Sequence, residues 1–332
     1  HVGSDKLYYI LQNIRAYIAD NGGKFIFNAR VDGLESQSGA LKGIKVTHTR
    51  GGVENIGCDA AVFAIGHSAR DTFEMLNREG VEMEAREFAV GVRIEHLASD
   101  IGFAQYGKNY VCLPAADYKL VSHAHERTVF TFCMCPGGVV IPAASEQGGV
   151  VVNGMSLYAR DGVNSNSALM VQMRREDFGS DDLFAGMRFQ REIEQRAYKA
   201  GGENYKAPVI TFGDFAADKF SGSFGEVKPT YAAGVTCAPL NDVLPKKACE
   251  ALKVAIPDMD RRLKGFASPH AVLTGVETRF SSPVRIIRSQ SLQSVSHENL
   301  YPCGEGSGYS GGITSSAADG IRTAEAIFER FK

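Results

Sequence analysis

The chain has 332 residues, enough for two domains or for one domain with a large insertion. Its formal net charge of −2 and the lack of a Lys/Arg block argue against a nucleic-acid-binding protein. No stretch approaches the roughly 18 uninterrupted apolar residues of a membrane span, and the first residues lack the pattern of a signal peptide, so we expect a soluble, cytoplasmic protein.

The cysteines and histidines form no pattern typical of a metal site. The chain has seven cysteines, an odd number, and none stand in a C-x-x-C pair. His123 and His125 share one face of a predicted strand, but no third ligand follows nearby. We therefore expect reduced thiols and no bound metal.

The first predicted element is a helix over residues 5–20, with Ser4 as its N-cap and Gly22–Gly23 as its end. Its apolar residues recur at helical spacing, namely Leu7, Ile10, Leu11, Ile14 and Ile18. A natural protein rarely begins three residues before a helix without a Met. We therefore interpret the chain as a fragment.

Short strands come next. Residues 24–28 predict a strand of a layered sheet. Residues 31–35, 41–48 and 53–57, separated by glycines, predict a small antiparallel meander. The apolar run 59–66 then predicts a strand that is buried on both faces.

A turn over residues 66–72 follows this strand and leads into a predicted helix over residues 72–77. Ser68 or Asp71 is placed to cap that helix, because their side-chain oxygens can accept from its first N–H groups.

The composition changes after this helix. Residues 88–275 predict short strands and then helices over 181–200 and 241–255, which we interpret as an inserted mixed β/α substrate domain. Residues 1–87 and 276–332 would form one discontinuous α/β domain. The strands expected in the insertion cover residues 88–96, 110–113, 120–122, 128–134 and 150–155.

A glycine-rich turn near the end of the chain is the strongest local signal. An apolar run at 300–303 is followed by five glycines within nine positions and then by a helix from Ile313. Free N–H groups and the positive end of the helix dipole favour an anion at such a turn, and glycines let it approach the backbone. The alternative is a tight loop that only needs positive φ.

Together, these pieces resemble the flavoprotein fold of the glutathione-reductase type. More narrowly, the chain is similar to the NAD(FAD)-utilising dehydrogenases, FAD-dependent proteins related to the HI0933-like flavoproteins. The motifs that carry this resemblance cover residues 1–7, 64–72, 88–96, 133–138, 153–156, 277–285 and 299–320.

The resemblance implies that the chain binds FAD. Glu305 would bond ribityl hydroxyl groups, and N–H groups near Gly312 would face the pyrimidine edge of the flavin. Residues 64–66 would pack near the pyrophosphate or the dimethylbenzene ring. Val31 would offer backbone contacts to adenine, a core valine being the alternative. The implied cofactor-binding residues are Gly304, Glu305, Gly306, Gly308, Tyr309, Gly311, Gly312, Ile313, Ala64, Ile65, Gly66 and Val31.

The chain departs from the family at its start. Such flavoproteins open with a βαβ unit that carries Gly-x-Gly-x-x-Gly and an acidic residue for the ribose. Neither is found here, so we expect the fragment to lack this N-terminal unit and with it the main contacts to the pyrophosphate of FAD.

Three side chains near the implied flavin are candidates for chemistry. Arg279 and Arg285 lie where the insertion returns to the first domain, and an arginine there would hold an anionic substrate or stabilise reduced flavin. An interdomain salt bridge is the alternative. His67, directly after Gly66, is a candidate proton donor or a helix-start contact.

Further candidates lie in the insertion. Cys133 and Cys135 would share one face of a strand, which suggests either a redox pair or a buried structural pair. Polar residues at 153–156 and 164–166 would line a substrate pocket or cap loops.

The leading hypothesis is an FAD-dependent oxidoreductase that transfers hydride between a small organic substrate and flavin, with NAD(P)H as an electron partner. A second hypothesis is a non-redox flavin- or nucleotide-binding protein that acts through partners or in nucleic-acid-related metabolism. A third takes the glycine turn as a self-contained NAD site, against which the missing βαβ unit argues.

Overall fold

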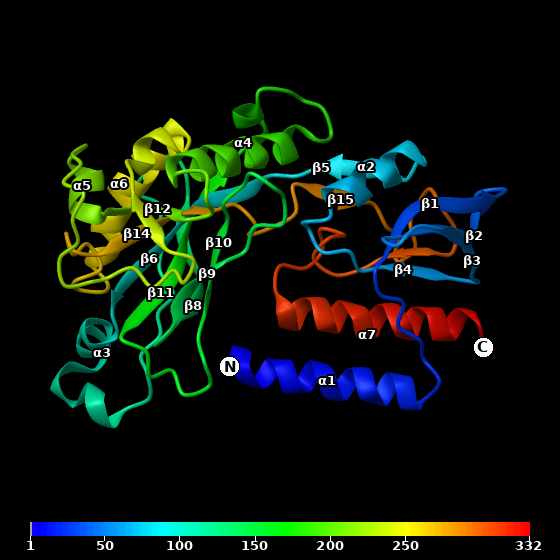
Figure 1. The fold of residues 1–332 in the computed structure, drawn as a ribbon, viewed down its shortest axis with the longest axis horizontal. Coiled ribbons are helices and arrows are strands. Elements are labelled where there is room, and N and C mark those ends of the chain that lie inside the picture. Colours follow the sequence, from blue (N-terminus) through cyan, green and yellow to red (C-terminus); the bar gives the residue numbers. More distant parts are fainter. Residues whose placement is uncertain (1) are drawn as a thin grey trace. The chain divides into compact units, whose positions relative to one another are not determined.

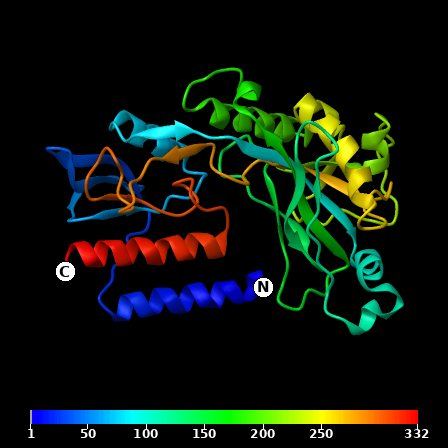
Figure 2. The same cartoon turned by 180° about the vertical axis from the view of Figure 1, so that it is seen from behind.

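A computed structural model describes residues 2–332, in which two units are distinguished (Figures 1 and 2). Unit 1 holds the chain up to Asp20 together with Ala89–Met173 and Phe189–Thr278. Unit 2 holds Asn21–Phe88, Arg174–Arg188 and Arg279–Lys332. His1, the first residue of the motif at 1–7, lies outside the described residues. The division into an interrupted flavin domain and an inserted domain stays a prediction.

Unit 1 is built on a seven-stranded mixed sheet with the strand order β13-β12-β14-β6-β11-β8-β7. Strands β12 and β13 pair in parallel, whereas β12 with β14 and β14 with β6 pair antiparallel. A separate hairpin joins β9 to β10. The strands are β6 (Phe88–Leu97), β7 (Val121–Ser122), β8 (Val129–Cys135), β9 (Val139–Pro142), β10 (Val152–Met155), β11 (Asn164–Met173), β12 (Ala207–Thr211), β13 (Val235–Cys237) and β14 (Val272–Glu277).

Helices cover this sheet. Helix α6 packs against β7, β8 and β11, and α5 packs against β12. The central strands β6, β11 and β14 are buried almost throughout, although β6 and β11 carry polar and charged residues among their apolar ones. The helices are α1 (Ser4–Asp20), α3 (Ala98–Tyr106), α4 (Ala185–Ala200), which begins in the sequence of unit 2, α5 (Phe212–Ala216) and α6 (Lys246–Asp260), with 3-10 turns at Gly107–Cys112 and Leu240–Asp242.

Unit 2 contains three small sheets. An antiparallel meander is formed by β1, β2 and β3, an antiparallel pair by β5 and β15, and a parallel pair by β4 and β16. Its core contains Leu41, Phe63, Phe73, Leu76 and Leu300. The elements are β1 (Ala29–Gln37), β2 (Ala40–His48), β3 (Val53–Gly57), β4 (Ala61–Phe63), α2 (Arg70–Arg78), β5 (Met83–Ala85), a 3-10 turn (Arg175–Phe178), β15 (Val284–Ile286), β16 (Leu300–Pro302) and α7 (Ile313–Arg330).

Several expected elements are confirmed within a few residues, among them the first helix, the meander, and the terminal strand and helix. The predicted strand at 24–28 is wrong. Phe25, Ile26 and Phe27 are 42%, 53% and 58% exposed and pair with no strand in the described chain. A strand needs a hydrogen-bonded neighbour, so an apolar sequence alone does not make one.

Three further predictions need correction. Val62 of β4 is 47% exposed, so the apolar run at 59–66 is not buried on both faces; its only described strand partner is β16. The predicted strand at 110–113 is not formed: residues 110–112 belong to a 3-10 turn, and Leu113 is its C-cap. Helix α2 has Ala69 as its N-cap, and among the described residues no side chain caps it, so neither Ser68 nor Asp71 does so.

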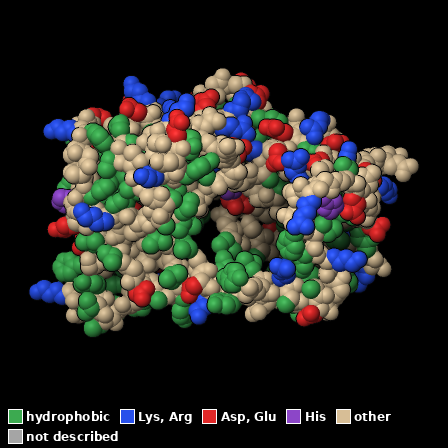
Figure 3. Space-filling model, viewed as in Figure 1, with side chains coloured by type: hydrophobic (Ala, Val, Ile, Leu, Met, Phe, Trp, Pro, Cys, Tyr) green, Lys and Arg blue, Asp and Glu red, His purple; other side chains and the backbone are tan. Residues whose placement is uncertain are grey.

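Helix α1 is also unusual, because none of its described residues is buried. Its apolar side chains include Tyr8, Leu11 and Tyr17, which are 61%, 58% and 71% exposed. Apolar side chains are visible between charged ones on the face drawn in Figure 3. None of the helices in residues 2–332 has the length and apolar character needed to cross a membrane.

Gly91 offers a direct test of packing in unit 1. A Cβ at this position would lie 1.9 Å from the carbonyl oxygen of Leu169 on the neighbouring β11. We expect Gly91→Ala to force β6 away from β11 and to lower the free energy of unfolding by about 3 kcal/mol or more. Gly57→Ala, whose Cβ would meet its nearest atom at 3.8 Å, is the control. Equal urea midpoints for the two variants would contradict the packing argument.

His96 makes the stability of unit 1 depend on pH. It is 2% exposed, its Nε2 donates to the carbonyl oxygen of Phe266 over 2.8 Å, and burial lowers its pKa. The unfolded chain binds a proton at this histidine near pH 6.5, whereas the folded chain does not. The free energy of unfolding should therefore fall as the pH drops below about 6.5, by at most about 1.4 kcal/mol per pH unit from this group. His96→Phe should show a correspondingly smaller slope in urea unfolding, and identical slopes would rule out this role.

Candidate functional site

The glycine-rich turn lies at one edge of the parallel pair β4 and β16. Because parallel strands end at the same edge, the turn after β4 meets the turn after β16. A Cβ at Gly306 would lie 2.5 Å from the carbonyl oxygen of Gly66. No other residue than glycine fits there without displacing the backbone. The structure thus brings Ala64, Ile65 and Gly66 beside Gly304, Glu305 and Gly306.

The backbone around this junction is open. Within residues 2–332 no atom comes within 4 Å of a Cβ placed at Gly66 or Gly311, and at Gly312 the nearest is the Oγ of Ser315 at 3.9 Å. Gly66, Gly304 and Gly308 have positive φ values of 64°, 75° and 79°, which glycine adopts without strain. A ligand can therefore approach the backbone closely here.

Helix α7 begins at this junction. Its N-cap is Gly312, and in the described chain no side chain caps it. The first turn of a helix leaves N–H groups without intrahelical partners, and an 18-residue helix adds the positive end of its dipole. Ile313 is 73% exposed at this end. Uncapped N–H groups at an exposed helix start are features that favour an anion, and anion binding at this turn stays a prediction.

His67 and Glu305 are brought together across the junction. The Nδ1 of His67 lies 3.2 Å from a carboxylate oxygen of Glu305. The Nε2 of His67 is buried and has no hydrogen-bond partner among residues 2–332. A buried polar atom without a partner is costly, so this nitrogen is suited to a ligand group that supplies one.

Two residues that the sequence analysis did not single out, Arg288 and Asp319, hold the glycine-rich turn in place. Arg288 makes two hydrogen bonds to the carboxylate of Asp319, at 2.9 and 2.7 Å, and Asp319 also accepts from the N–H of Gly304. Burial alone would raise the pKa of Asp319, but these bonds outweigh it and keep the pKa below its usual value. Asp319 lies in the small-residue stretch of α7 and is buried, which the sequence alone does not show.

Three further predicted residues differ in their relation to the turn, and of these Arg285 bonds it directly. Val31, in β1, packs against the hydrophobic core of unit 2, which agrees with the core-valine alternative. Arg279 is buried, with 8% exposure. Contact of Val31 with adenine and a catalytic role for Arg279 stay predictions. Arg285 bonds the carbonyl oxygen of Gly308 and pairs with Glu84.

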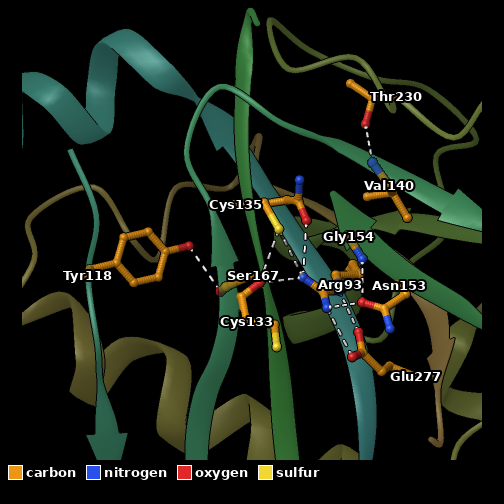
Figure 4. A network of polar contacts seen from close by, with 11 residues as sticks. Arg93, Tyr118, Cys133, Cys135, Val140, Asn153, Gly154, Ser167, Thr230 and Glu277 are labelled. Atoms are coloured by element: carbon orange, nitrogen blue, oxygen red, sulfur yellow. Dashed lines mark hydrogen bonds and ion pairs between the residues drawn. The ribbon is translucent and has the colours of Figure 1, made fainter. Parts of the chain in front are cut away.

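A second polar cluster lies in the sheet of unit 1 (Figure 4). Arg93 is fully buried and pairs with Glu277 through two hydrogen bonds, at 2.5 and 3.0 Å. Its other donors reach the side-chain oxygens of Asn153 and Asn166 and the carbonyl oxygen of Cys133. Burial alone would lower the pKa of Arg93, but the Glu277 carboxylate outweighs this and raises the pKa above its usual value.

Cys133 and Cys135 do not share a face, which corrects the expectation from regular strand geometry. The register between β8 and β11 shifts at Ala168, and Cys133 has a φ of 41°. This bulge turns the Cys133 side chain outward, while Cys135 is buried and donates to the carbonyl oxygen of Cys133. Both cysteines are free thiols.

The comparisons with known proteins identify the class. The family model named FAD-dependent protein, C-terminal domain-like, matches residues 87–280, more than half of the chain. The chain therefore belongs to this family of FAD-dependent proteins. Membership of the narrower HI0933-like group stays a prediction.

A curated protein of Clostridium beijerinckii, named only as an uncharacterized protein, is 50% identical over 335 residues. The match covers 100% of this chain and 62% of that relative, so the chain spans less than two thirds of the relative's length.

Solved structures give weaker similarity. The flavin-dependent brominase Bmp2 is 12% identical, with a TM-score of 0.41, and the match covers 95% of this chain and 52% of that one. Pyridoxine 4-oxidase from Mesorbium loti is 9% identical, with a TM-score of 0.32, covering 92% of this chain and 57% of that one. The family assignment rests on the family model.

The buried pair in unit 1 predicts a large effect of one substitution. Glu277→Gln removes the negative charge and leaves the Arg93 guanidinium buried without its counter-charge. We expect a loss of about 3–5 kcal/mol in the free energy of unfolding. Glu329→Gln, at an exposed pair with Lys332, should cost less than about 1 kcal/mol in the same urea titration. A loss at Glu277 no larger than that of the control would show that the pair does not stabilise the fold.

Proposed function

We propose that the protein is an FAD-dependent oxidoreductase and that the junction of the two glycine turns holds its FAD. The observation that carries this proposal is the contact of Gly66 with Gly306 beside the uncapped start of α7. Open glycine backbone and unpaired N–H groups are what a pyrophosphate or an anionic flavin edge requires. Family membership supplies the identity of the cofactor.

The side chains at the junction fit the polar groups of FAD. The Glu305 carboxylate would accept hydrogen bonds from ribityl hydroxyl groups. The unpartnered Nε2 of His67 would gain its missing partner from the cofactor or the substrate, and Nδ1 would remain held by Glu305. The start of α7 would stabilise negative charge near Gly312 and Ile313.

When bound, FAD supplies hydride chemistry, and the residues of the chain orient the reacting groups. His67 is the proposed proton donor, and Arg279 is the proposed anchor for an anionic group of a small organic substrate. NAD(P)H as the electron partner rests on the family resemblance alone. Because the chain spans 62% of its curated relative, the activity of the whole protein is part of this proposal.

The first test is a visible absorbance titration with FAD. The purified chain and the whole Clostridium beijerinckii relative are titrated, and bound flavin is then exposed to NADH and NADPH without oxygen. We expect the absorbance bands of FAD to shift on binding. Loss of these bands after addition of NADH or NADPH would support the oxidoreductase function. Absence of flavin binding by both proteins would refute the proposal. Binding without reduction by any electron donor would favour a non-redox flavoprotein.

Gly306→Ala tests the site itself. Its Cβ would push the turns apart, so we expect the dissociation constant for FAD to rise about tenfold or more. Gly320→Ala is the matched control, because a Cβ there meets no atom within 4 Å in the described chain. Equal FAD affinity for the two variants in the same titration would place the cofactor elsewhere.

A further inference from the structure

We propose that Arg288, Asp319 and Tyr309 form a latch that holds the glycine-rich turn in its ligand-binding shape. These three residues act as positioning residues, and the inference rests on the proposed FAD site. The hydrogen bonds that make up the latch go to Pro302, to Gly304 and between these three residues, and not to Gly66 or Gly306. Their effect on a ligand would pass through the backbone of residues 304–309.

The first half of the latch is the ion pair between Arg288 and Asp319. Its two side chains are 8% and 9% exposed, so water screens the pair little. One carboxylate oxygen of Asp319 accepts two hydrogen bonds. One comes from the Arg288 guanidinium at 2.9 Å and the other from the N–H of Gly304 at 2.8 Å. Arg288 also donates to the carbonyl oxygen of Pro302. The end of β16, the first glycine of the turn and the body of α7 are thereby tied to one charge pair.

The second half of the latch is the ring of Tyr309, at the far end of the turn. The guanidinium carbons of Arg288 and Arg285 lie 4.1 and 4.7 Å from the ring centroid, within range for cation–π attraction. The hydroxyl oxygen of Tyr309 accepts from the backbone N–H of Arg288. Arg288 therefore holds both ends of the turn, Gly304 through Asp319 and Tyr309 through its own backbone and guanidinium.

The turn needs such support because of its backbone. Gly304 and Gly308 adopt positive φ, a conformation that glycine enters freely and also leaves freely. A flexible turn would lose conformational entropy when it closes on a ligand, whereas a turn that is already held loses less. The latch would thus raise affinity by preorganisation and not by contact.

The test uses two measurements on Asp319→Asn, Arg288→Lys and Tyr309→Phe. Hydrogen exchange of the chain without FAD reports the turn directly, and we expect faster exchange at residues 304–312 with little change in α6. The FAD titration reports affinity, and we expect the dissociation constant to rise about tenfold for Asp319→Asn and less for Tyr309→Phe, which loses one hydrogen bond but keeps its ring.

Two control variants separate positioning from general loss of stability. Glu325→Gln, on the same helix, should change neither measurement. Leu76→Ala, in the core of unit 2, should lower the thermal midpoint without accelerating exchange at the turn selectively. If Leu76→Ala weakens FAD binding as much as Asp319→Asn does, the loss is one of stability and the latch is refuted.

The outcomes distinguish the latch from the proposed function. Unchanged exchange at residues 304–312 in Asp319→Asn would overturn the latch whether or not FAD binds. Faster exchange with unaltered FAD affinity would also overturn it, because holding the turn in place would then not contribute to FAD binding. A wild-type chain that binds no FAD would refute the function for this chain, and the exchange data would still decide whether the turn is held.

Discussion

The parallel pairing of β4 with β16 is the constraint on which the candidate site depends. Three pairs of residues, from Leu300 with Ala61 to Pro302 with Phe63, join segments that are more than two hundred positions apart in sequence. Parallel strands end at the same edge, so this short ladder places both following turns together. Gly66 and Gly306 then touch through their backbones, and α7 starts beside them. Without the pairing, each turn would be an ordinary glycine loop.

Much of the fold could be predicted because the local patterns agreed with the packing. The helix expected from Ile313 corresponds to α7, and the apolar run at 300–303 corresponds to β16. The same reasoning failed for Phe25–Phe27, whose apolar sequence has no strand partner among the described residues. It also missed β11, although its ten residues lie at the centre of the larger sheet, because the polar start at Asn164 resembled a loop. Tertiary neighbours, which the sequence does not display, decide such segments.

The position of the candidate site could be predicted because clustered glycines have few structural roles. Clusters of glycine mark a turn, and the order of strand, turn and helix indicates an anion site. Charged residues are less informative, because a salt bridge, a solvated surface and an active site all use them. Arg288 and Asp319 therefore gave no separate signal. Cys133 shows a different limit of sequence-based prediction. Strand periodicity placed it on the same face as Cys135, but its left-handed backbone at a bulge turns its side chain to the other face.

The exposed helix α1 has a consequence for the spectroscopy of the protein. The chain contains no tryptophan and 12 tyrosines, so tyrosine dominates its ultraviolet emission. Tyr8, Tyr9 and Tyr17, three of these emitters, stand on α1 at 61%, 60% and 71% exposure. Any molecule that covers this helix changes their surroundings and hence their emission. Tyrosine fluorescence is thus a built-in reporter of the α1 surface, read without a label.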